Sequence, residues 1–193
     1  MSSQVKVRRV LGLLVSVSLG VAVIVGWVAS AEAAPESSAQ AEIRGCEDEG
    51  ISGTATLKER PSPEGVKLVD IEIRVQGMKP GKHAVHVHEV GTCDPCGAAK
   101  GHFDPGPNSN SSPDGNHPFH MGDLINLKVG EDGTGRLRTI TSRITLSPGP
   151  LSVLDENGSA FIIHVDPDTY CPEGEAKGCA GGSRAACGVI ATK

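Results

Sequence analysis

The feature that most constrains the fold is a segment of eight residues, 69–76, in which apolar and polar side chains alternate strictly. Alternation with a period of two is typical of a β-strand that buries one face and exposes the other. Helical periodicity is nearly absent, and 25 glycines and 13 prolines interrupt the chain often. Further segments with strand character are residues 41–45, 53–59, 83–89, 124–129, 135–141 and 160–165.

Turn signals separate these segments, among them the Asp-Gly pair within residues 130–133. Short strands divided by turns predict an all-β fold, a β-sandwich or barrel. Two long segments, residues 91–122 and 166–186, lack strand character and are rich in glycine. Long ordered loops in a compact β-domain are uncommon and usually functional, so we expect the functional residues to lie on or beside these two.

The histidines are confined to one part of the chain. Residues His86 and His88 stand two apart in a predicted strand, so their side chains project from the same face. Such a pair can be a satisfied polar pair, or it can offer two nitrogen ligands to one metal ion, and imidazole suits copper or zinc. The clustering of all seven histidines favours the metal: His83, His86, His88, His102, His117, His120 and His164.

The N-terminal 33 residues have the pattern of a secretory leader. Basic residues in the first ten precede an uncharged apolar run over residues 10–31, and small-residue cleavage sites follow. The alternative is an uncleaved membrane anchor, because a run of this length can span a bilayer. Either way we expect export to the periplasm or the extracellular space. The predicted organisation is a leader over 1–33, a linker over 34–42 and one domain over 43–193.

Charge and cysteine content limit the function classes. Removing residues 1–33 reduces the 18 basic and 23 acidic side chains to 15 and 22, a net charge of −7. This balance argues against a nucleic acid or an anionic membrane as partner. All six cysteines lie in the predicted exported part, where an even number indicates three disulfides. A zinc site at Cys93 and Cys96 is the alternative, but no second pair has matching spacing.

Five motifs follow one another in the region that holds the histidines. They are His86-Val87-His88-Glu89, Gly101-His102-Phe103-Asp104-Pro105, His120-Met121-Gly122-Asp123-Leu124, Ile162-Ile163-His164-Val165 and Gly182-Ser183-Arg184-Ala185-Ala186-Cys187-Gly188. In kind and order they resemble the copper/zinc superoxide dismutases of the secreted, bacterial type, over residues 43–193. The resemblance implies an immunoglobulin-like Greek-key β-sandwich, a flattened eight-stranded barrel with two long functional loops.

The same resemblance implies roles for individual residues. Copper would be held by His86, His88, His102 and His164, and zinc by His102, His117, His120 and Asp123. The shared residue, His102, would bridge the two metals and take part in catalysis. Arg184 would guide the anionic substrate to copper, and Asp168 would join the two metal shells by hydrogen bonds. His83 would be structural and bond the backbone.

One position departs from the family pattern. The second zinc histidine of the family usually lies midway between the residues matching His102 and His120, where this chain has Asn110 and Ser111. The spare histidine nearby is His117. Either the loop folds back and delivers His117 to zinc, or His117 faces solvent and zinc has three protein ligands.

The resemblance also bears on the disulfides. Cys96 and Cys187 match the intrasubunit disulfide of the family, although Cys93 and Cys96 can exchange roles opposite Cys187. Cys171 and Cys179 enclose seven residues and would pin the second loop. Cys46 and Cys93 remain as the third pair.

The function implied by the resemblance is the disproportionation of superoxide to dioxygen and hydrogen peroxide, with copper and zinc as cofactors. Arg184 and the complete set of copper histidines favour this enzyme. The rival hypothesis is a non-catalytic protein of the cell envelope that binds or buffers copper or zinc. A structural β-sandwich without activity is a third hypothesis, which the complete copper set disfavours. Superoxide would be the small-molecule partner, and the sequence leaves monomer and homodimer open.

Overall fold

A computed structural model describes residues 37–106, 112, 115–172 and 176–193. The predicted leader, residues 1–33, and the first residues of the predicted linker, 34–36, lie outside these ranges. No helix in the described part of the chain is long and apolar enough to cross a membrane.

The described chain is built from antiparallel strands and one short 3₁₀ helix, η1 (Cys96–Ala99). The strands are β1 (Ser38–Gly45), β2 (Ser52–Pro61), β3 (Lys67–Gln76), β4 (Gly81–His83), β5 (Val85–His88), β6 (Leu127–Val129), β7 (Gly135–Thr141), β8 (Ala160–His164), β9 (Arg184–Val189) and β10 (Ala191–Thr192).

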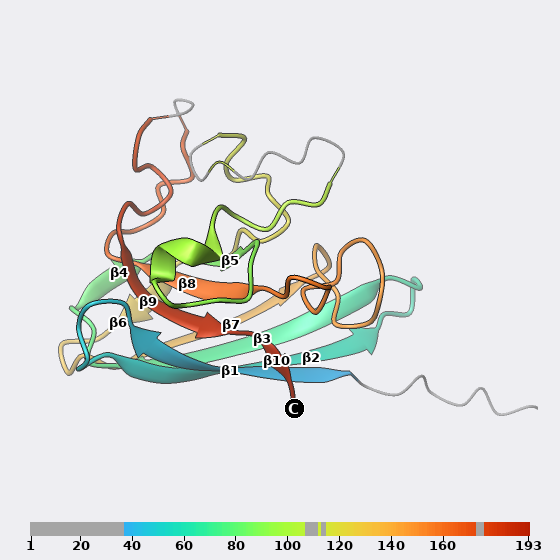
Figure 1. Ribbon diagram of the computed structural model, residues 1–193, viewed down its shortest axis with the longest axis horizontal. Helices are drawn as coiled ribbons and strands as arrows, with labels where there is room; N and C mark the ends of the chain where they lie inside the picture. The colour runs from blue at the N-terminus through green and yellow to red at the C-terminus, as the bar shows by residue number, and fades with distance from the viewer. Residues whose placement is uncertain (1–36, 107–111, 113–114, 173–175) are drawn as a thin grey trace, which may run out of the picture. The chain divides into compact units, whose positions relative to one another are not determined.

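The strands form one sheet in the order β4-β6-β7-β3-β2-β1-β9-β8-β5, with β10 added beside β1. The two end strands, β4 and β5, are consecutive in the chain, so the sheet curls into a nearly closed barrel (Figure 1). Ala84 lies between them, and its carbonyl accepts a hydrogen bond from the backbone N–H of His164. The predicted all-β sandwich or flattened barrel is therefore confirmed.

The alternation of residues 69–76 reappears as the burial pattern of β3. Val69, Ile71, Ile73 and Val75 are all buried, whereas the residues between them are partly or fully exposed. They pack in the core of the barrel with other Val, Ile and Leu side chains and with Phe103 and Phe161. Burial of apolar surface at roughly 25 cal/mol per Å² is what holds such a barrel together.

Two predictions about the strands and linker need correction, and strand β9 was not predicted. The first strand begins at Ser38, so the predicted linker over 34–42 is wrong from that residue on, because Ala39 and Ala41 are buried in the core. The predicted strand over 83–89 is two strands, which separate at Ala84. The strand β9 has no counterpart among the predicted segments, since small residues and an arginine conceal its pattern.

The two long segments without strand character rise on the same side of the barrel, beside β5 and β8 (Figure 1). They contact each other directly, because the Nε2 atom of His117 in the first lies 2.7 Å from the carboxylate of Asp168 in the second. The fold thus brings the two segments over strands β5 and β8, which carry His86, His88 and His164.

Candidate metal centre

Strand β5 supplies the base of the site. All four of its residues are buried, with Val85 and Val87 packed in the barrel core and His86 and His88 on the other face. The neighbouring strand β8 pairs Ile162 opposite His86 and ends at His164. Two rigid strands therefore fix three imidazoles.

The first histidine cluster joins these three residues to His102 of the first long segment. One ligand atom from each of His86, His88, His102 and His164 lies within 4.8 Å of the others. Within this cluster, the Nδ1 atom of His86 is 3.2 Å from the Nε2 atom of His164. The Nε2 atoms of His88 and His102 are buried and have no hydrogen-bond partner. Buried polar atoms without partners are rare in proteins, so these two fit a ligand such as a metal ion.

The opposite ring nitrogens of this cluster contact hydrogen-bond acceptors. The Nδ1 atom of His88 is 2.8 Å from the carbonyl of Lys100, and that of His164 is 2.9 Å from the carbonyl of Gly182. A carbonyl accepts only, so each Nδ1 carries the proton and each Nε2 offers a lone pair. Such partners fix the orientation and tautomer of metal-binding histidines.

The second cluster gathers around the carboxylate of Asp123. The Nδ1 atom of His102 lies 2.7 Å from Oδ1, and the Nδ1 atoms of His117 and His120 lie 3.1 Å and 3.0 Å from Oδ2. The His117 Nδ1 atom is close to this oxygen but has no hydrogen bond of suitable angle. Three imidazoles and one carboxylate are a donor set that suits tetrahedral zinc. The structure therefore brings His117 into the group despite its unusual position in the sequence.

Asp168 touches both clusters. One of its carboxylate oxygens, Oδ2, is 3.0 Å from the Nε2 atom of His86 and 2.7 Å from the Nε2 atom of His117. The side chain of Asn126 holds the main chain of Asp168. Its amide oxygen accepts from the N–H of Asp168 at 2.8 Å, and its amide nitrogen donates to the carbonyl of Asp168 at 2.9 Å. The carboxylate is thus fixed between a histidine of each group.

Burial and local charge keep most of these imidazoles neutral. Burial lowers the pKa of His86 to about 3 and that of His164 to about 4, against hydrogen bonds that raise them. Burial also lowers the pKa values of His88 and His102. Neutral imidazole is the form that binds a metal. The exception is His117, whose pKa rises to about 9 because the nearby carboxylates of Asp123 and Asp168 outweigh the effect of burial.

The two carboxyls remain charged. Burial opposes ionisation, but the imidazoles of His102, His117 and His120 around the carboxylate lower the pKa of Asp123 far below its ordinary value. For Asp168, hydrogen bonds from His117 and His86 likewise outweigh burial and lower the pKa. A positive ion at the site would therefore meet two negative charges and mostly neutral imidazoles, and His117 would have to release its extra proton to bind the ion.

Arg184, the first residue of β9, lies beside the first cluster. Its guanidinium donates to the main-chain carbonyls of Cys96 and Lys100, at the two ends of η1. After burial and the effect of His102, the positive charge of Arg184 adds to the lowering of the pKa values of His88 and His164. The guanidinium is therefore within electrostatic reach of the cluster.

His83 has the structural place expected of it. Its ring nitrogens lie 2.9 Å and 2.8 Å from the carbonyls of His164 and Lys79. It therefore ties β4 to the end of β8 and to the preceding turn and has no place among the ligands.

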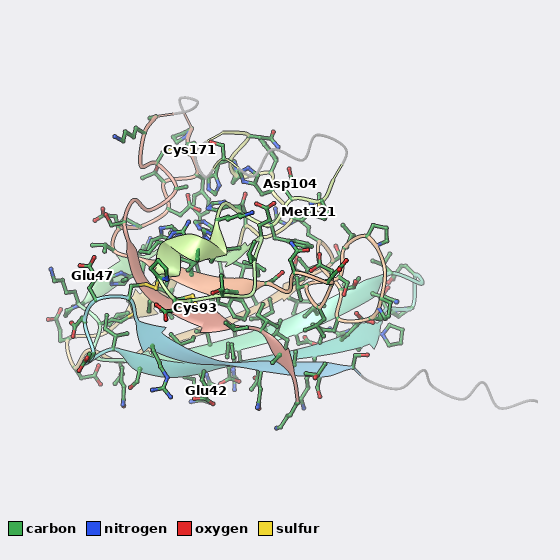
Figure 2. The ribbon with its side chains drawn as sticks, viewed as in Figure 1. Glu42, Glu47, Cys93, Asp104, Met121 and Cys171 are labelled. Atoms are coloured by element: carbon green, nitrogen blue, oxygen red, sulfur yellow. A yellow bond between two sulfur atoms is a disulfide. The ribbon has the colours of Figure 1, made fainter. Side chains whose placement is uncertain are left out.

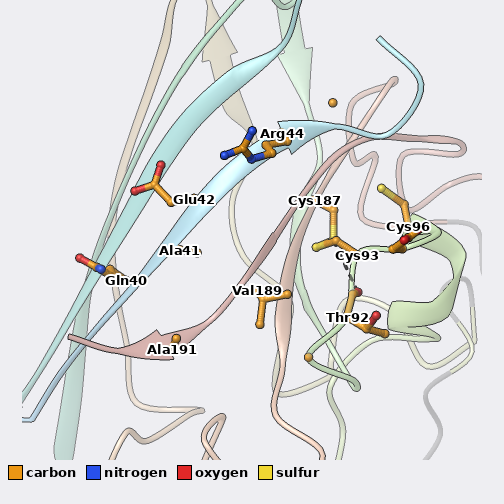
Figure 3. A pocket seen from close by; sticks show the side chains of 13 residues that line it. Gln40, Ala41, Glu42, Arg44, Thr92, Cys93, Cys96, Cys187, Val189 and Ala191 are labelled. Carbon is orange, nitrogen blue, oxygen red and sulfur yellow. Dashed lines mark hydrogen bonds between the residues drawn. A yellow bond between two sulfur atoms is a disulfide. The ribbon is translucent and has the colours of Figure 1, made fainter. Parts of the chain in front are cut away.

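The disulfides correct two predicted pairings. Cys46 is bonded to Cys96 and Cys93 to Cys187, in place of the predicted Cys96–Cys187 and Cys46–Cys93 pairs. Figure 3 shows Cys93 beside Cys187, on the wall of a surface pocket of about 580 Å³. Spacing within the sequence could not separate two cysteines only three residues apart.

The third predicted pair, Cys171–Cys179, is present. Cys171 lies in the upper loop region, away from Cys93 beside the barrel (Figure 2). This disulfide pins the second long segment, as expected.

Sequence reasoning missed two supporting residues, Asn126 and Arg143. Asn126 holds Asp168, and Arg143 donates to main-chain carbonyls of Pro118, His120 and Asp123. Neither residue is close in sequence to the group that it holds, and no local motif marks it. The only available signal was the polar character of Asn126, three residues after Asp123.

The barrel and its two adjoining histidine groups define an all-β protein with two candidate metal sites. Comparison with known proteins makes this specific: the family described as copper/zinc superoxide dismutase (SODC) matches residues 51–190. The chain therefore belongs to the copper/zinc superoxide dismutase family, whose members typically bind copper and zinc.

Individual proteins and solved structures of this family and fold are also similar to the chain. The superoxide dismutase [Cu-Zn] of Deinococcus radiodurans is 41% identical over 156 residues, which cover 72% of this chain and 77% of the relative. A crystal structure of a double mutant of a SOD-like protein from Bacillus subtilis matches with a TM-score of 0.59 and 32% identity, over 78% of this chain and 95% of that one. A crystal structure of the clock protein EA4 matches with a TM-score of 0.61 and 27% identity, over 81% of this chain and 95% of that one.

Proposed function

We propose that this protein converts superoxide to dioxygen and hydrogen peroxide at a copper ion that shares His102 with a structural zinc ion. One observation carries the proposal. The buried, unpartnered Nε2 atoms of His88 and His102 converge with His86 and His164, and a half-buried arginine stands beside them. A metal store needs the ligands but has no use for the arginine.

The donor set assigns the two ions. We propose His86, His88, His102 and His164 for copper, since an all-nitrogen set suits this metal. We propose His102, His117, His120 and Asp123 for zinc. When bound, copper supplies the one-electron chemistry, and the protein supplies geometry and electrostatics.

Arg184 would attract and orient the substrate. The net charge of the chain is negative, so attraction of an anion depends on the local field at the site. A cationic group beside a cleft can raise association rates about 10- to 1000-fold. The carbonyls of Cys96 and Lys100 hold two of its nitrogens, which fixes the guanidinium in one orientation.

His102 would also handle a proton. Its Nδ1 atom faces the proposed zinc ligand Asp123 at 2.7 Å, so its unpartnered Nε2 atom is the position at which a proton can be taken up and given to the product. Asp168 would keep His86 and His117 oriented while this occurs.

We also propose that the protein acts outside the cytoplasm, in the periplasm or the extracellular space. The leader pattern of residues 1–33 supports export. The three disulfides support an oxidising compartment. Superoxide formed or present there would be the substrate.

Metal binding without turnover is the second candidate function. Two similar structures, of a SOD-like protein and of a clock protein, indicate that this fold also occurs in proteins that are not called superoxide dismutases. The two candidates share all their metal ligands, so only turnover separates them.

The test is superoxide consumption by protein reconstituted with copper and zinc, with the metal content of each sample measured. We expect rapid consumption, which a chelator removes and which Arg184→Ala reduces. Arg138→Ala, which removes an exposed arginine paired with Glu72, is the matched control and should leave the rate unchanged. Full copper occupancy without turnover would reject the enzyme and favour the metal-binding protein.

A further inference from the structure

Arg143, two residues after the end of β7, makes an unusual set of contacts. Its Nη1 atom donates to the carbonyl of Pro118 at 3.3 Å and to that of His120 at 3.0 Å, and its Nη2 atom donates to the carbonyl of Asp123. All three acceptors lie in the short segment that carries His117, His120 and Asp123. One side chain therefore holds this segment at three points.

Other arginines from the same part of the barrel behave differently. Arg136 and Arg138 form exposed ion pairs with Glu72 across the sheet. The hydrogen bonds found for the Arg143 side chain, among the described residues, all go to main-chain oxygens. A guanidinium has five donors in a rigid fork, so it can hold several carbonyls in one arrangement where a lysine cannot.

The backbone of Arg143 is held in place by its neighbours. Its backbone N–H donates to the hydroxyl of Thr141 at 3.1 Å, and the next residue, Ile144, is fully buried in the core. The side chain therefore links a fixed point of the barrel to the segment that carries His117, His120 and Asp123.

The segment also has a second attachment, at Gly122. The carbonyl of Gly122 accepts from Val87 of β5 at 2.8 Å, and its N–H donates to Phe103 at 2.8 Å. These bonds fix one point of the chain between His120 and Asp123. The contacts of Arg143 fix residues on both sides of that point, so the direction of the segment is determined as well as its position.

We infer that Arg143 is a positioning residue for the zinc half of the metal centre. It holds the backbone of residues 118–123 so that the Nδ1 atoms of His117 and His120 and the carboxylate of Asp123 converge before a metal binds. The inference deepens the proposed function, since it assumes that these groups bind zinc. Residues that orient the ligands of a metal typically change its affinity about 10- to 100-fold when they are replaced.

The experiment compares zinc binding by the full chain, its Arg143→Met and Arg143→Lys variants, and Arg138→Met as a matched control. Zinc affinity and release are measured by competition with a chromogenic chelator. The absorption spectrum of cobalt bound in place of zinc reports the ligand geometry without reference to enzyme activity. Copper content is measured in parallel.

We expect Arg143→Met to release zinc about 10- to 100-fold faster and to alter the cobalt spectrum, with copper content unchanged. Arg143→Lys should release zinc almost as fast as Arg143→Met, because an ammonium group does not have the fork that reaches three carbonyls. Arg138→Met should match the wild type. The lysine variant retains the charge and most of the side chain, so it also provides the test if the methionine variant does not fold.

Two results would overturn the inference in different ways. If both Arg143 variants fold and hold zinc as tightly as the wild type, Arg143 does not position the ligands, although the metal centre stands. A variant with reduced melting temperature but unchanged zinc release leads to the same conclusion, because Arg143 then stabilises the fold only. If the wild-type protein binds no zinc, the proposed zinc site itself fails, and the inference fails with it.

Discussion

The Nε2 atom of His117 lies 2.7 Å from the Oδ2 atom of Asp168. The same oxygen is 3.0 Å from the Nε2 atom of His86, so one carboxylate links a histidine of the proposed zinc site to one of the proposed copper site. This contact has two consequences: it explains how a histidine from an unusual position in the sequence is kept in the site, and it makes Asp168 a point at which both sites can be disturbed together.

Replacing Asp168 with asparagine should weaken zinc binding about 10- to 100-fold. The amide carries no negative charge, and its NH₂ group replaces one carboxylate oxygen, so it would oppose either the two imidazoles at Oδ2 or the N–H of Tyr170 at Oδ1. The measurement is zinc competition with a chelator, with Asn157→Ala as a control on a side chain that bonds the loop residue Glu89. Unchanged zinc affinity in the folded variant would show that His117 is held by other contacts.

Replacing Arg184 with alanine should lower the rate of superoxide consumption about tenfold or more while leaving copper content unchanged. The wild-type rate should also fall as salt is added, since screening acts over about 8 Å at physiological ionic strength. The alanine variant should show a weaker dependence on salt. Loss of copper in this variant would instead assign Arg184 a structural role.

The Cys46–Cys96 disulfide should affect the position of Arg184 as well as stability. Cys96 supplies one of the carbonyls that hold the guanidinium, and the backbone N–H of Cys46 donates to Ala185 at 2.8 Å. Replacing both cysteines with alanine should lower the free energy of unfolding by about 4 kcal/mol, from the loop that the bond closes. The double replacement should also reduce the rate of superoxide consumption. In a protein that already carries Arg184→Ala it should cause no further reduction, because the disulfide acts on the rate through the position of Arg184.

Replacing Cys171 and Cys179 is the matched control for that prediction. The two cysteines are only eight positions apart in the sequence. By the same loop-closure argument, loss of their bond should lower the free energy of unfolding by about 2.5 kcal/mol. Peptide mapping of the oxidised protein checks the pairing itself. Recovery of a Cys96–Cys187 peptide would contradict the pairing in the structure.

The buried carboxyl of Glu59 should make stability depend on pH in the acid range. Burial opposes ionisation, but hydrogen bonds from Ser147 and Leu146 outweigh it and lower the pKa of Glu59 below its ordinary 4.5. The carboxylate therefore stabilises the folded state fully above about pH 4.5. This contribution is lost as the pH falls through the lowered pKa.

Chemical denaturation of the metal-free protein between about pH 3 and 6 measures this effect. Glu59→Gln should reduce the dependence on pH and cost about 1–3 kcal/mol at neutral pH. The exposed Glu131→Gln is the control. Identical pH profiles for Glu59→Gln and the wild type would contradict the role of this carboxyl.

Much of the site could be predicted from local pattern. Alternation along a strand places His86 and His88 on one face whatever the rest of the fold, and the buried apolar run before His164 marks a second strand. The core strand β3 was equally predictable, because its alternation is uninterrupted. These features depend on neighbours in the sequence.

The remaining features depend on contacts between distant segments. Strand β9 buries small residues against β1 and β8, so its sequence carries little alternation. The partners of Cys93 and Cys96 depend on how η1 approaches β1 and β9, which a spacing of three residues does not reveal. Arg143 lies 20 residues from Asp123, and the antiparallel pairing of β6 with β7 brings the two together.

The close approach at Gly122 has a consequence for recognising such proteins. A Cβ atom at this position would lie 2.2 Å from the carbonyl oxygen of Val87, so only glycine allows the chain to return to β5 here. The return point, rather than the number of residues before it, sets where His120 and Asp123 lie. Loops of different lengths can therefore place His120 and Asp123 in the same positions. A search that scores only the intervals between histidines would pass over chains like this one.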